Sequence, residues 1–137
     1  MSAVPFPDLP LSVRYAISSV CAVARADRPL STPHLAEATG APRPFLAKVL
    51  GALVTAELLE GVRGRTGGFR LARSADAITI RAIVDAVQDR PHTPRICAMR
   101  NQPCDDADPC AMHTRWMVAS EPVKAMLRTT TIADLTA

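Results

Sequence analysis

Three of the four cysteines and one of the three histidines of this chain lie within residues 97–113. Six residues separate Cys97 from Cys104, five separate Cys104 from Cys110, and two separate Cys110 from His113. These intervals do not follow the 3.6-residue period of a helix, so the four side chains can converge only if the segment folds as a loop. The segment therefore predicts a loop that wraps a bound group, and the rest of the chain has to form the body that carries it.

The residue types and their spacing favour an iron–sulfur cluster as the bound group. A cluster takes soft ligands, mostly thiolates, from a loop that can surround an object several ångströms across. A single zinc ion is more often held by cysteine pairs only two to four residues apart. Pro103 and Pro109 precede the second and third cysteines and keep the backbone before them out of a helix. Structural zinc and a thiol-based redox switch remain as alternatives.

The other polar residues of the loop leave the fourth ligand open. His113 either supplies an imidazole or is an exposed residue at the start of the next helix, and His92 competes with it. Asp105, Asp106 and Asp108 lie between the second and third cysteines. Because neighbouring negative charges disfavour ionisation, we expect the metal-free loop either to be disordered or to have thiols with raised pKa values.

The composition predicts one closely packed, mainly helical domain. A chain of 137 residues is long enough for one hydrophobic core. Hydrophobic residues make up 48% of the sequence and aromatic residues only 4%, so the core has to consist of Ala, Val, Leu and Ile. No apolar run of about 18 residues is present, and residues 1–10 lack the features of a signal peptide, so we expect a cytoplasmic protein without a membrane partner. In the reducing cytoplasm, clustered cysteines more often bind metal or sense redox state than form structural disulfides. Cys21, in the apolar stretch 20–24, is expected to be a core residue.

The first half of the chain predicts a helix-turn-helix. Apolar residues at intervals of three and four predict a helix over residues 12–26. Ser31 can cap a second helix that ends at Gly40, and Pro42 and Pro44 open a third helix with apolar residues at helical spacing. Two short helices joined by a turn that contains glycine are typical of this DNA-binding motif.

A β-hairpin follows, over residues 58–63 and 68–73, with its tip at 64–67. Four arginines and no acidic residue lie between Gly61 and Arg73, so basic charge is concentrated here although the net charge is only +3. A hairpin directly after the third helix is the wing of a winged helix. The glycine-rich tip is not a phosphate loop, because no helix follows it directly, and no catalytic constellation is visible, so we do not expect an enzyme.

The remaining segments complete a predicted organisation in three units. Residues 78–80 are expected to pair back onto the hairpin, and Thr79 to cap a helix after them. Apolar residues after the loop predict a helix, interrupted at Pro122, whose uncovered face is a candidate dimer interface. A capped turn over residues 131–135 ends the chain. The expected fold is therefore mainly α with a small β-hairpin: a winged helix-turn-helix domain (1–90), a cluster-binding loop (91–113) and a C-terminal dimerisation helix region (114–137).

Several strings together carry a resemblance that covers almost the whole chain. They are residues 14–16 (Arg-Tyr-Ala), 35–36 (Leu-Ala), 45–46 (Phe-Leu), the wing sequence 62–71, residues 78–80 and the three-cysteine loop. With them the chain resembles the winged-helix iron–sulfur regulators of bacteria, the family that includes IscR, NsrR and RirA. The resemblance implies a homodimer on a two-fold-symmetric site in double-stranded DNA, with the third helix in the major groove and the wing in the minor groove. The DNA-binding residues it implies are Arg43, Phe45, Lys48, Arg63 and Arg65.

The resemblance also implies the cofactor and its ligands. Cys97, Cys104 and Cys110 would bind the iron–sulfur cluster, and His113 matches the histidine that follows the third cysteine in [2Fe–2S] members. A [2Fe–2S] cluster is therefore favoured and a [4Fe–4S] cluster is possible. Other members use an acidic residue near the start of the first helix, where this chain has Arg14. The expected function is a transcription regulator that senses iron–sulfur status, redox state or nitric oxide.

Overall fold

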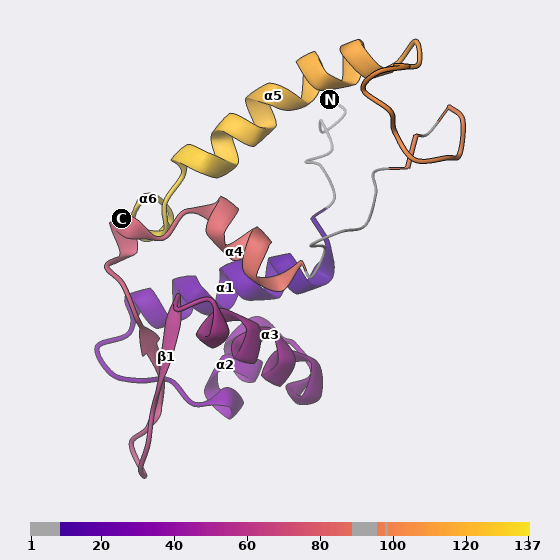
Figure 1. The fold of residues 1–137 in the computed structure, drawn as a ribbon. Coiled ribbons are helices and arrows are strands. Elements are labelled where there is room, and N and C mark those ends of the chain that lie inside the picture. Colours follow the sequence, from indigo (N-terminus) through magenta and orange to yellow (C-terminus); the bar gives the residue numbers. More distant parts are fainter. Residues whose placement is uncertain (1–8, 89–95, 98) are drawn as a thin grey trace, which may run out of the picture.

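The computed structural model describes residues 9–88, 96–97 and 99–137 (Figure 1). The elements in chain order are α1 (Leu11–Arg25), α2 (Thr32–Thr39), α3 (Arg43–Thr55), β1 (Leu59–Val62), β2 (Gly68–Leu71), η1 (Ala75–Ala77), α4 (Ile80–Val87), α5 (His113–Thr129) and α6 (Ile132–Thr136). The fold is mainly helical with a two-stranded hairpin, as predicted. A membrane-crossing helix, long and apolar enough to span a bilayer, is absent from the described residues.

Helix α1 runs through the centre of the body and contacts α2, α3, α4, α6 and β2. Its apolar residues recur at three- and four-residue intervals, so one face of the helix is buried. Cys21 is 7% exposed and belongs to this core, as predicted. The largest fully buried side chains of the other elements are aliphatic: Leu35, Leu46, Leu50, Leu53, Leu58, Leu59, Ile78, Ile83 and Ile132. Helices that approach closely through small and aliphatic side chains are what the composition predicts.

Helices α2 and α3 form the predicted helix-turn-helix. The Ser31 side chain caps α2 by accepting a hydrogen bond from the backbone N–H of His34 at 3.4 Å. Gly40 ends α2 in the left-handed conformation, with φ of 73°, which glycine adopts without a steric penalty. Helix α3 begins directly after Pro42, with a proline in its first turn, where a missing N–H leaves no bond unmade.

The hairpin is fixed to the body at its base. Strand β1 pairs antiparallel with β2, with Val62 opposite Gly68. Phe69 exchanges two backbone hydrogen bonds, of 3.0 and 2.8 Å, with Leu30 in the connection between α1 and α2. Gly68 has φ of +149°, and a Cβ atom there would lie 2.4 Å from the Leu30 carbonyl atoms. The base of the wing therefore requires glycine, whereas its tip projects away from the body (Figure 1).

Residues 78–80 pair with the C-terminal tail, so the prediction that they pair onto the hairpin is wrong. Thr79 forms an antiparallel bridge with Thr131, and the N–H of Ile132 donates to the Ile78 carbonyl at 2.9 Å. The pairing brings two completely buried isoleucine side chains, Ile78 and Ile132, into one core, which favours the tail as the partner. Thr79 also caps α4, as predicted, by accepting from the N–H of Ala82 at 3.1 Å.

Helix α5 connects this body to the cysteine loop. It contacts α4 and extends away from the body to the loop at its N-terminal end (Figure 1). The sequence predicts that Pro122 kinks or restarts this helix, and the restart is wrong, because the helix continues through this residue. The carbonyl that loses its partner belongs to Val118, a residue that is 70% exposed, so water can take the missing hydrogen bond. No described residue of α5 is buried.

Candidate metal centre and nucleic-acid interface

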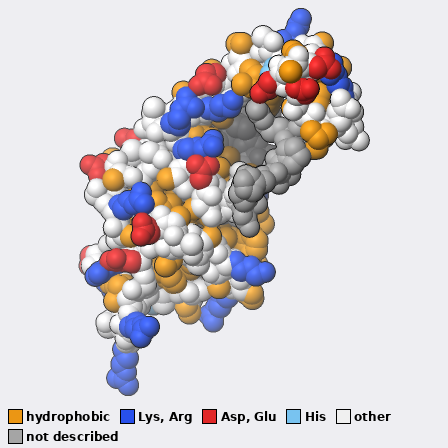
Figure 2. All heavy atoms as spheres, in the orientation of Figure 1, with side chains coloured by type: hydrophobic (Ala, Val, Ile, Leu, Met, Phe, Trp, Pro, Cys, Tyr) orange, Lys and Arg blue, Asp and Glu red, His pale blue; other side chains and the backbone are white. Residues whose placement is uncertain are grey.

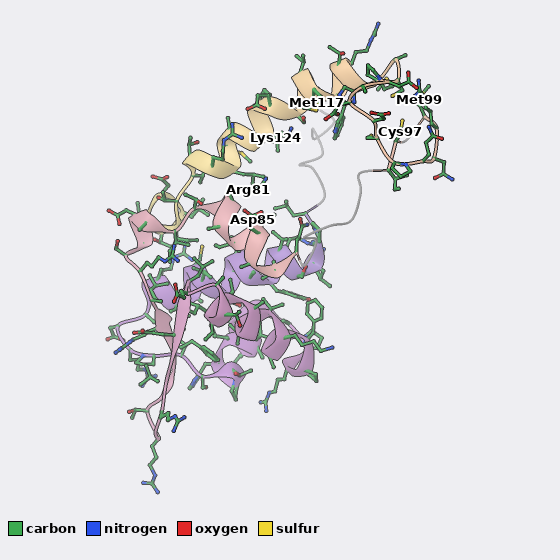
Figure 3. All side chains as sticks on the ribbon, viewed as in Figure 1. Arg81, Asp85, Cys97, Met99, Met117 and Lys124 are labelled. Atoms are coloured by element: carbon green, nitrogen blue, oxygen red, sulfur yellow. The ribbon has the colours of Figure 1, made fainter. Side chains whose placement is uncertain are left out.

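The cysteine loop lines a small cavity of about 10 Å³ next to the start of α5. All four ligands predicted from the sequence line this cavity, together with charged residues and a proline. The lining residues are Cys97, Arg100, Pro103, Cys104, Asp105, Asp108, Cys110 and His113. Figure 3 shows Cys97 and Met99 in this loop, far from the helix-turn-helix. The structure therefore brings together side chains up to sixteen positions apart in the sequence.

Two of the thiols are in direct contact. The Sγ atoms of Cys97 and Cys110 lie 3.4 Å apart and are hydrogen-bonded, well beyond the bond length of about 2.05 Å in a disulfide. Cys97 is 6% exposed and Cys110 is half-buried. The carbonyl of Cys110 accepts a hydrogen bond from the N–H of His113 at 3.0 Å, which ties this cysteine to the first residue of α5.

The backbone around Cys97 folds into a tight turn. The N–H of Cys97 donates to the Gln102 carbonyl at 2.7 Å, and the N–H of Asn101 donates to the Cys97 carbonyl at 2.8 Å. Ile96 and Pro103 form an isolated antiparallel bridge just outside this turn. Asn101 has φ of 51°, a left-handed conformation that asparagine tolerates better than most residues. The turn returns the chain, so that the next residue, Cys104, lines the same cavity as Cys97.

The prediction of raised thiol pKa values is wrong for Cys97, whose pKa is lowered. The main cause is the hydrogen bond with Cys110, and the backbone N–H groups of Arg100 and Met99 and the Arg100 charge act in the same direction. One of the loop carboxylates is paired with a cation. The Arg100 guanidinium donates to the Asp108 carboxylate at 2.8 Å and to its carbonyl oxygen at 2.9 Å. The Asp106 carboxylate lies 3.4 Å from His113 Nε2.

Sequence reasoning missed Arg100, which lines the cavity and holds the segment between Cys104 and Cys110 through Asp108. The sequence feature that could have identified Arg100 is that no other Lys or Arg lies between Cys97 and His113. The competing ligand His92 lies outside the described residues. Within residues 9–88, 96–97 and 99–137, no three Cys, His, Asp or Glu side chains are arranged to hold a single metal ion.

The chemistry of the donors around the cavity fits an iron–sulfur cluster. Three thiols and one imidazole line it, and these are ligand types that such clusters accept. Cys21 is not part of this set. It lies in the core of α1, where burial raises the pKa of its thiol and makes it an unreactive packing residue.

The residues predicted to contact DNA from α3 lie at and near its N-terminus. Arg43 is the first residue of the helix, and Lys48 is also exposed. Phe45 is 37% exposed, and its ring packs edge-on against Tyr15 of α1, with 5.8 Å between the ring centroids. Phe45 therefore helps to fix α3 on α1, a role that helical periodicity alone does not identify.

The four arginines of the hairpin differ in their surroundings. Arg70 forms an ion pair with Glu60 across the strands, and the Arg73 guanidinium donates to the Ala56 carbonyl at 3.5 Å. Arg63 and Arg65 are exposed, and among the described side chains neither has an acidic partner. Figure 2 shows basic side chains at the hairpin end of the molecule, well away from the acidic side chains of the cysteine loop.

The same end of the molecule contains a groove between the hairpin and the start of α2. Its lining combines polar side chains at the α2 N-terminus with glycines of the hairpin: Ser31, Thr32, Pro33, Gly61, Val62, Arg63, Gly64, Gly67, Gly68 and Phe69. Exposed backbone N–H groups at a helix start favour anions. Of the wing arginines, Arg63 lines this groove.

Comparison with known proteins identifies the family. The Rrf2 family, described as iron-dependent transcriptional regulators, matches residues 10–137. An HTH-type transcriptional regulator of Aquifex aeolicus (strain VF5) is 34% identical over 127 residues, which cover 90% of this chain and 88% of the relative. The HTH-type transcriptional regulator IscR of Yersinia enterocolitica serotype O:8 is 30% identical over 124 residues, or 89% of this chain and 74% of the relative.

A solved structure shows the same fold. The structure of CymR (YrzC), the global cysteine regulator of B. subtilis, superposes with a TM-score of 0.77 at 23% identity, covering 96% of this chain and 97% of CymR. The relatives are regulators and not enzymes, as predicted. The chain therefore belongs to the Rrf2 family of transcriptional regulators.

Proposed function

We propose that this regulator controls its DNA affinity through an iron–sulfur cluster bound by Cys97, Cys104, Cys110 and His113. The observation that carries the proposal is that one cavity is lined by all four of these side chains. A [2Fe–2S] cluster is favoured over [4Fe–4S] because His113 matches the histidine that follows the third cysteine in the [2Fe–2S] members that the chain resembles. When bound, the cluster supplies a group that is gained, lost or oxidised in response to iron, redox state or nitric oxide.

The route from the loop to the DNA-reading helices is continuous. Cys110 is hydrogen-bonded to the first residue of α5, α5 contacts α4, and α4 contacts α1 and α3. A change in the order of the loop therefore changes the position of α5 relative to the body. We expect this to shift the population between conformations that differ in DNA affinity.

Four of the five DNA-contacting residues predicted from the sequence keep that role in this proposal, and Phe45 takes a positioning role instead. Arg63 and Arg65 would contact phosphates from the wing, and their lack of acidic partners in the described chain supports this assignment. Arg43 and Lys48 would reach base edges or phosphates from α3. Phe45 would place α3 by packing against Tyr15.

The proposed assembly is a homodimer on a two-fold-symmetric site, with α5 as the interface. Four exposed large apolar side chains lie at helical spacing along α5 and just before it: Met112, Trp116, Val123 and Met126. Val118 is also exposed but belongs to a different side of the helix. Monomeric soluble proteins rarely leave such an apolar stripe open to water. A second copy of the chain is the partner that a symmetric DNA site requires.

Anaerobic reconstitution with iron and sulfide tests the cluster. We expect visible absorption, with about two iron and two sulfide per chain for a [2Fe–2S] cluster, and a large loss of both in a Cys104→Ala variant. A Cys104→Ala variant that holds a full cluster would sink the proposal. Zinc at about one per chain, with no visible absorption, would instead support the structural zinc alternative.

A further inference from the structure

We infer that Arg100 fixes Cys110 at the cavity through Asp108 and raises the reduction potential of a cluster bound there. The first part stands on contacts of the described loop. The second part rests on the proposed function, because it requires a bound cluster. Arg100 is not a proposed ligand. It is a positioning residue, which acts on the site through Asp108 and through its charge.

The contact of Arg100 with Asp108 reaches the third cysteine over a short stretch of backbone. The Arg100 guanidinium donates to the carboxylate and to the carbonyl oxygen of Asp108, at 2.8 and 2.9 Å. That carbonyl belongs to the planar peptide that joins Asp108 to Pro109, and the proline ring fixes the next φ angle. The ψ angle of Pro109 is therefore the remaining soft backbone rotation between the held peptide and the Cα atom of Cys110.

The other end of this contact is also fixed. Arg100 lies inside the tight turn of residues 97–102, which is closed by two backbone hydrogen bonds of Cys97, of 2.7 and 2.8 Å. On the far side of Cys110, the His113 N–H donates to the Cys110 carbonyl at 3.0 Å. Loss of the Arg100 contact therefore removes the support on the N-terminal side of Cys110 and leaves the support from α5.

The charge of Arg100 acts on the site from close range. Arg100 lines the cavity together with the four proposed ligands, and no other Lys or Arg lies between Cys97 and His113. Its side chain is 36% exposed and that of Asp108 is 76% exposed, so solvent screens the carboxylate more than the guanidinium. Because arginine stays protonated throughout the physiological pH range, this positive charge is permanent.

A positive charge beside the ligands has a defined effect on a bound cluster. The cluster supplies one-electron chemistry, and its reduced form carries one more negative charge than its oxidised form. Coulomb attraction to Arg100 therefore stabilises the reduced form more than the oxidised form. By the same argument Arg100 raises the reduction potential and the Asp108 carboxylate lowers it.

Two single variants separate this electrostatic role from a merely structural one. Arg100→Gln and Asp108→Asn both break the ion pair, but the first removes a positive charge and the second removes a negative charge. Each protein is reconstituted anaerobically with iron and sulfide and titrated with dithionite in the presence of mediator dyes. At a fixed ambient potential, we expect the ratio of reduced to oxidised cluster to fall about three- to tenfold in Arg100→Gln, where tenfold corresponds to about 59 mV. In Asp108→Asn the ratio should rise.

Arg115 provides the matched control. It is an exposed arginine of α5, two residues after His113, and it is not among the residues that line the cavity. Arg115→Gln makes the same change of charge and should alter the ratio by less than about twofold. Arg100→Lys keeps the charge and should return the ratio to within about twofold of the wild type.

Two results would overturn the electrostatic role. One is a shift of the potential in the same direction in Arg100→Gln and Asp108→Asn, which indicates a general distortion of the loop. The other is a shift in Arg115→Gln as large as that in Arg100→Gln, which indicates an effect of net charge alone.

NMR relaxation of the cluster-free protein tests the positioning role. In Arg100→Gln and in Asp108→Asn, we expect the backbone order parameters of Ala107 and Cys110 to fall by about 0.2, towards the flexible range. Unchanged order parameters in α1, α2 and α3 would show that each variant is folded. Order parameters of Ala107 and Cys110 that stay at the wild-type values in both variants would overturn the positioning role.

The inference and the cluster proposal fail separately. A wild type that takes up iron and sulfide, with a potential that neither variant changes, refutes the electrostatic role and leaves the cluster proposal standing. A wild type that takes up no iron and sulfide refutes the cluster proposal and with it the effect on the potential, while the NMR measurement still decides the positioning of Cys110. A folded variant that loses the cluster supports the positioning role if its loop order falls and contradicts it if the loop order is unchanged.

Discussion

Replacement of Gly68 by alanine should detach the wing from the body and destabilise the protein. Gly68 has φ of +149°, and a Cβ atom there would lie 2.4 Å from both the carbonyl carbon and the oxygen of Leu30, and 2.7 Å from the backbone nitrogen of Ser31. All of these are backbone atoms, so no flexible side chain can move aside. The substitution therefore has to push the hairpin away from the connection between α1 and α2.

The expected loss has two parts. A non-glycine residue in this region of φ costs about 1–3 kcal/mol. The displacement also weakens the two hydrogen bonds between Phe69 and Leu30, now 3.0 and 2.8 Å long, each worth about 1 kcal/mol. Together they lower the free energy of unfolding by about 2–4 kcal/mol, and the melting temperature by about 10 °C for a domain of this size.

Denaturant unfolding followed by circular dichroism measures this change, and Gly61→Ala is the matched control. Gly61 lies in the same hairpin, but a Cβ atom there meets nothing within 4 Å and its φ is not in the left-handed region. The control should be neutral or more stable by about 0.4–1 kcal/mol. A loss below about 0.5 kcal/mol for Gly68→Ala, or an equal loss in both variants, would refute the argument from the Leu30 contact.

Three further predictions concern DNA, assembly and pH. Replacement of both Arg63 and Arg65 by alanine should weaken DNA binding and reduce the slope of log K against log salt by roughly 1.8, as measured by titration at several salt concentrations. Trp116→Glu, at a site 66% exposed on α5, should halve the mass measured by light scattering. The backbone N–H of Thr131 lowers the pKa of Asp134. This carboxylate therefore stabilises the fold above its usual pKa of about 3.9, and the stabilisation is lost as the pH falls through the lowered pKa. The difference in unfolding free energy between wild type and Asp134→Asn should shrink over that acidic range.

Each of these has a control within the chain. Arg70→Ala removes an arginine that is already paired with Glu60, so it should leave the salt slope nearly unchanged, and an equal reduction would contradict the role of the two unpaired arginines. Trp116→Phe should keep the dimer, because it keeps an apolar ring. A constant difference between Asp134→Asn and wild type from pH 7 to pH 2 would show that the carboxylate does not stabilise α6.

Local signals predicted most of the fold. Ser31 and Gly40 set the limits of α2, and Thr79 starts α4, because capping depends on residues within one turn of the helix end. The partner of residues 78–80 was not predictable in this way. The pairing of residues 78–80 depends on the burial of Ile132, which lies more than fifty positions away in the sequence. The residue pattern of the segment 78–80 does not distinguish the C-terminal tail from the hairpin as its partner.

For the site, sequence spacing predicted which side chains converge but not how they are arranged. The three cysteines and His113 line one cavity, but spacing alone does not predict the contact between the Cys97 and Cys110 sulfurs. The lowered pKa of Cys97 comes first from the hydrogen bond with Cys110 and then from the backbone N–H groups of Arg100 and Met99, whereas charge counting on the nearby aspartates predicted the opposite direction. Backbone N–H groups carry no sequence signature, so their effect appears only in the folded loop.

The packing of Ile132 against Ile78 has a consequence for the order of events during synthesis. Ile132 is completely buried in the same core as α1, and the Arg25 side chain donates to the Leu135 carbonyl across 110 positions of sequence. Contacts of such long range form late, because the intervening chain has to be ordered first. The helix-turn-helix body therefore acquires its last core side chain only after the cysteine loop and α5 have left the ribosome, so a nascent chain reaches its full stability only when it already carries the cysteine loop.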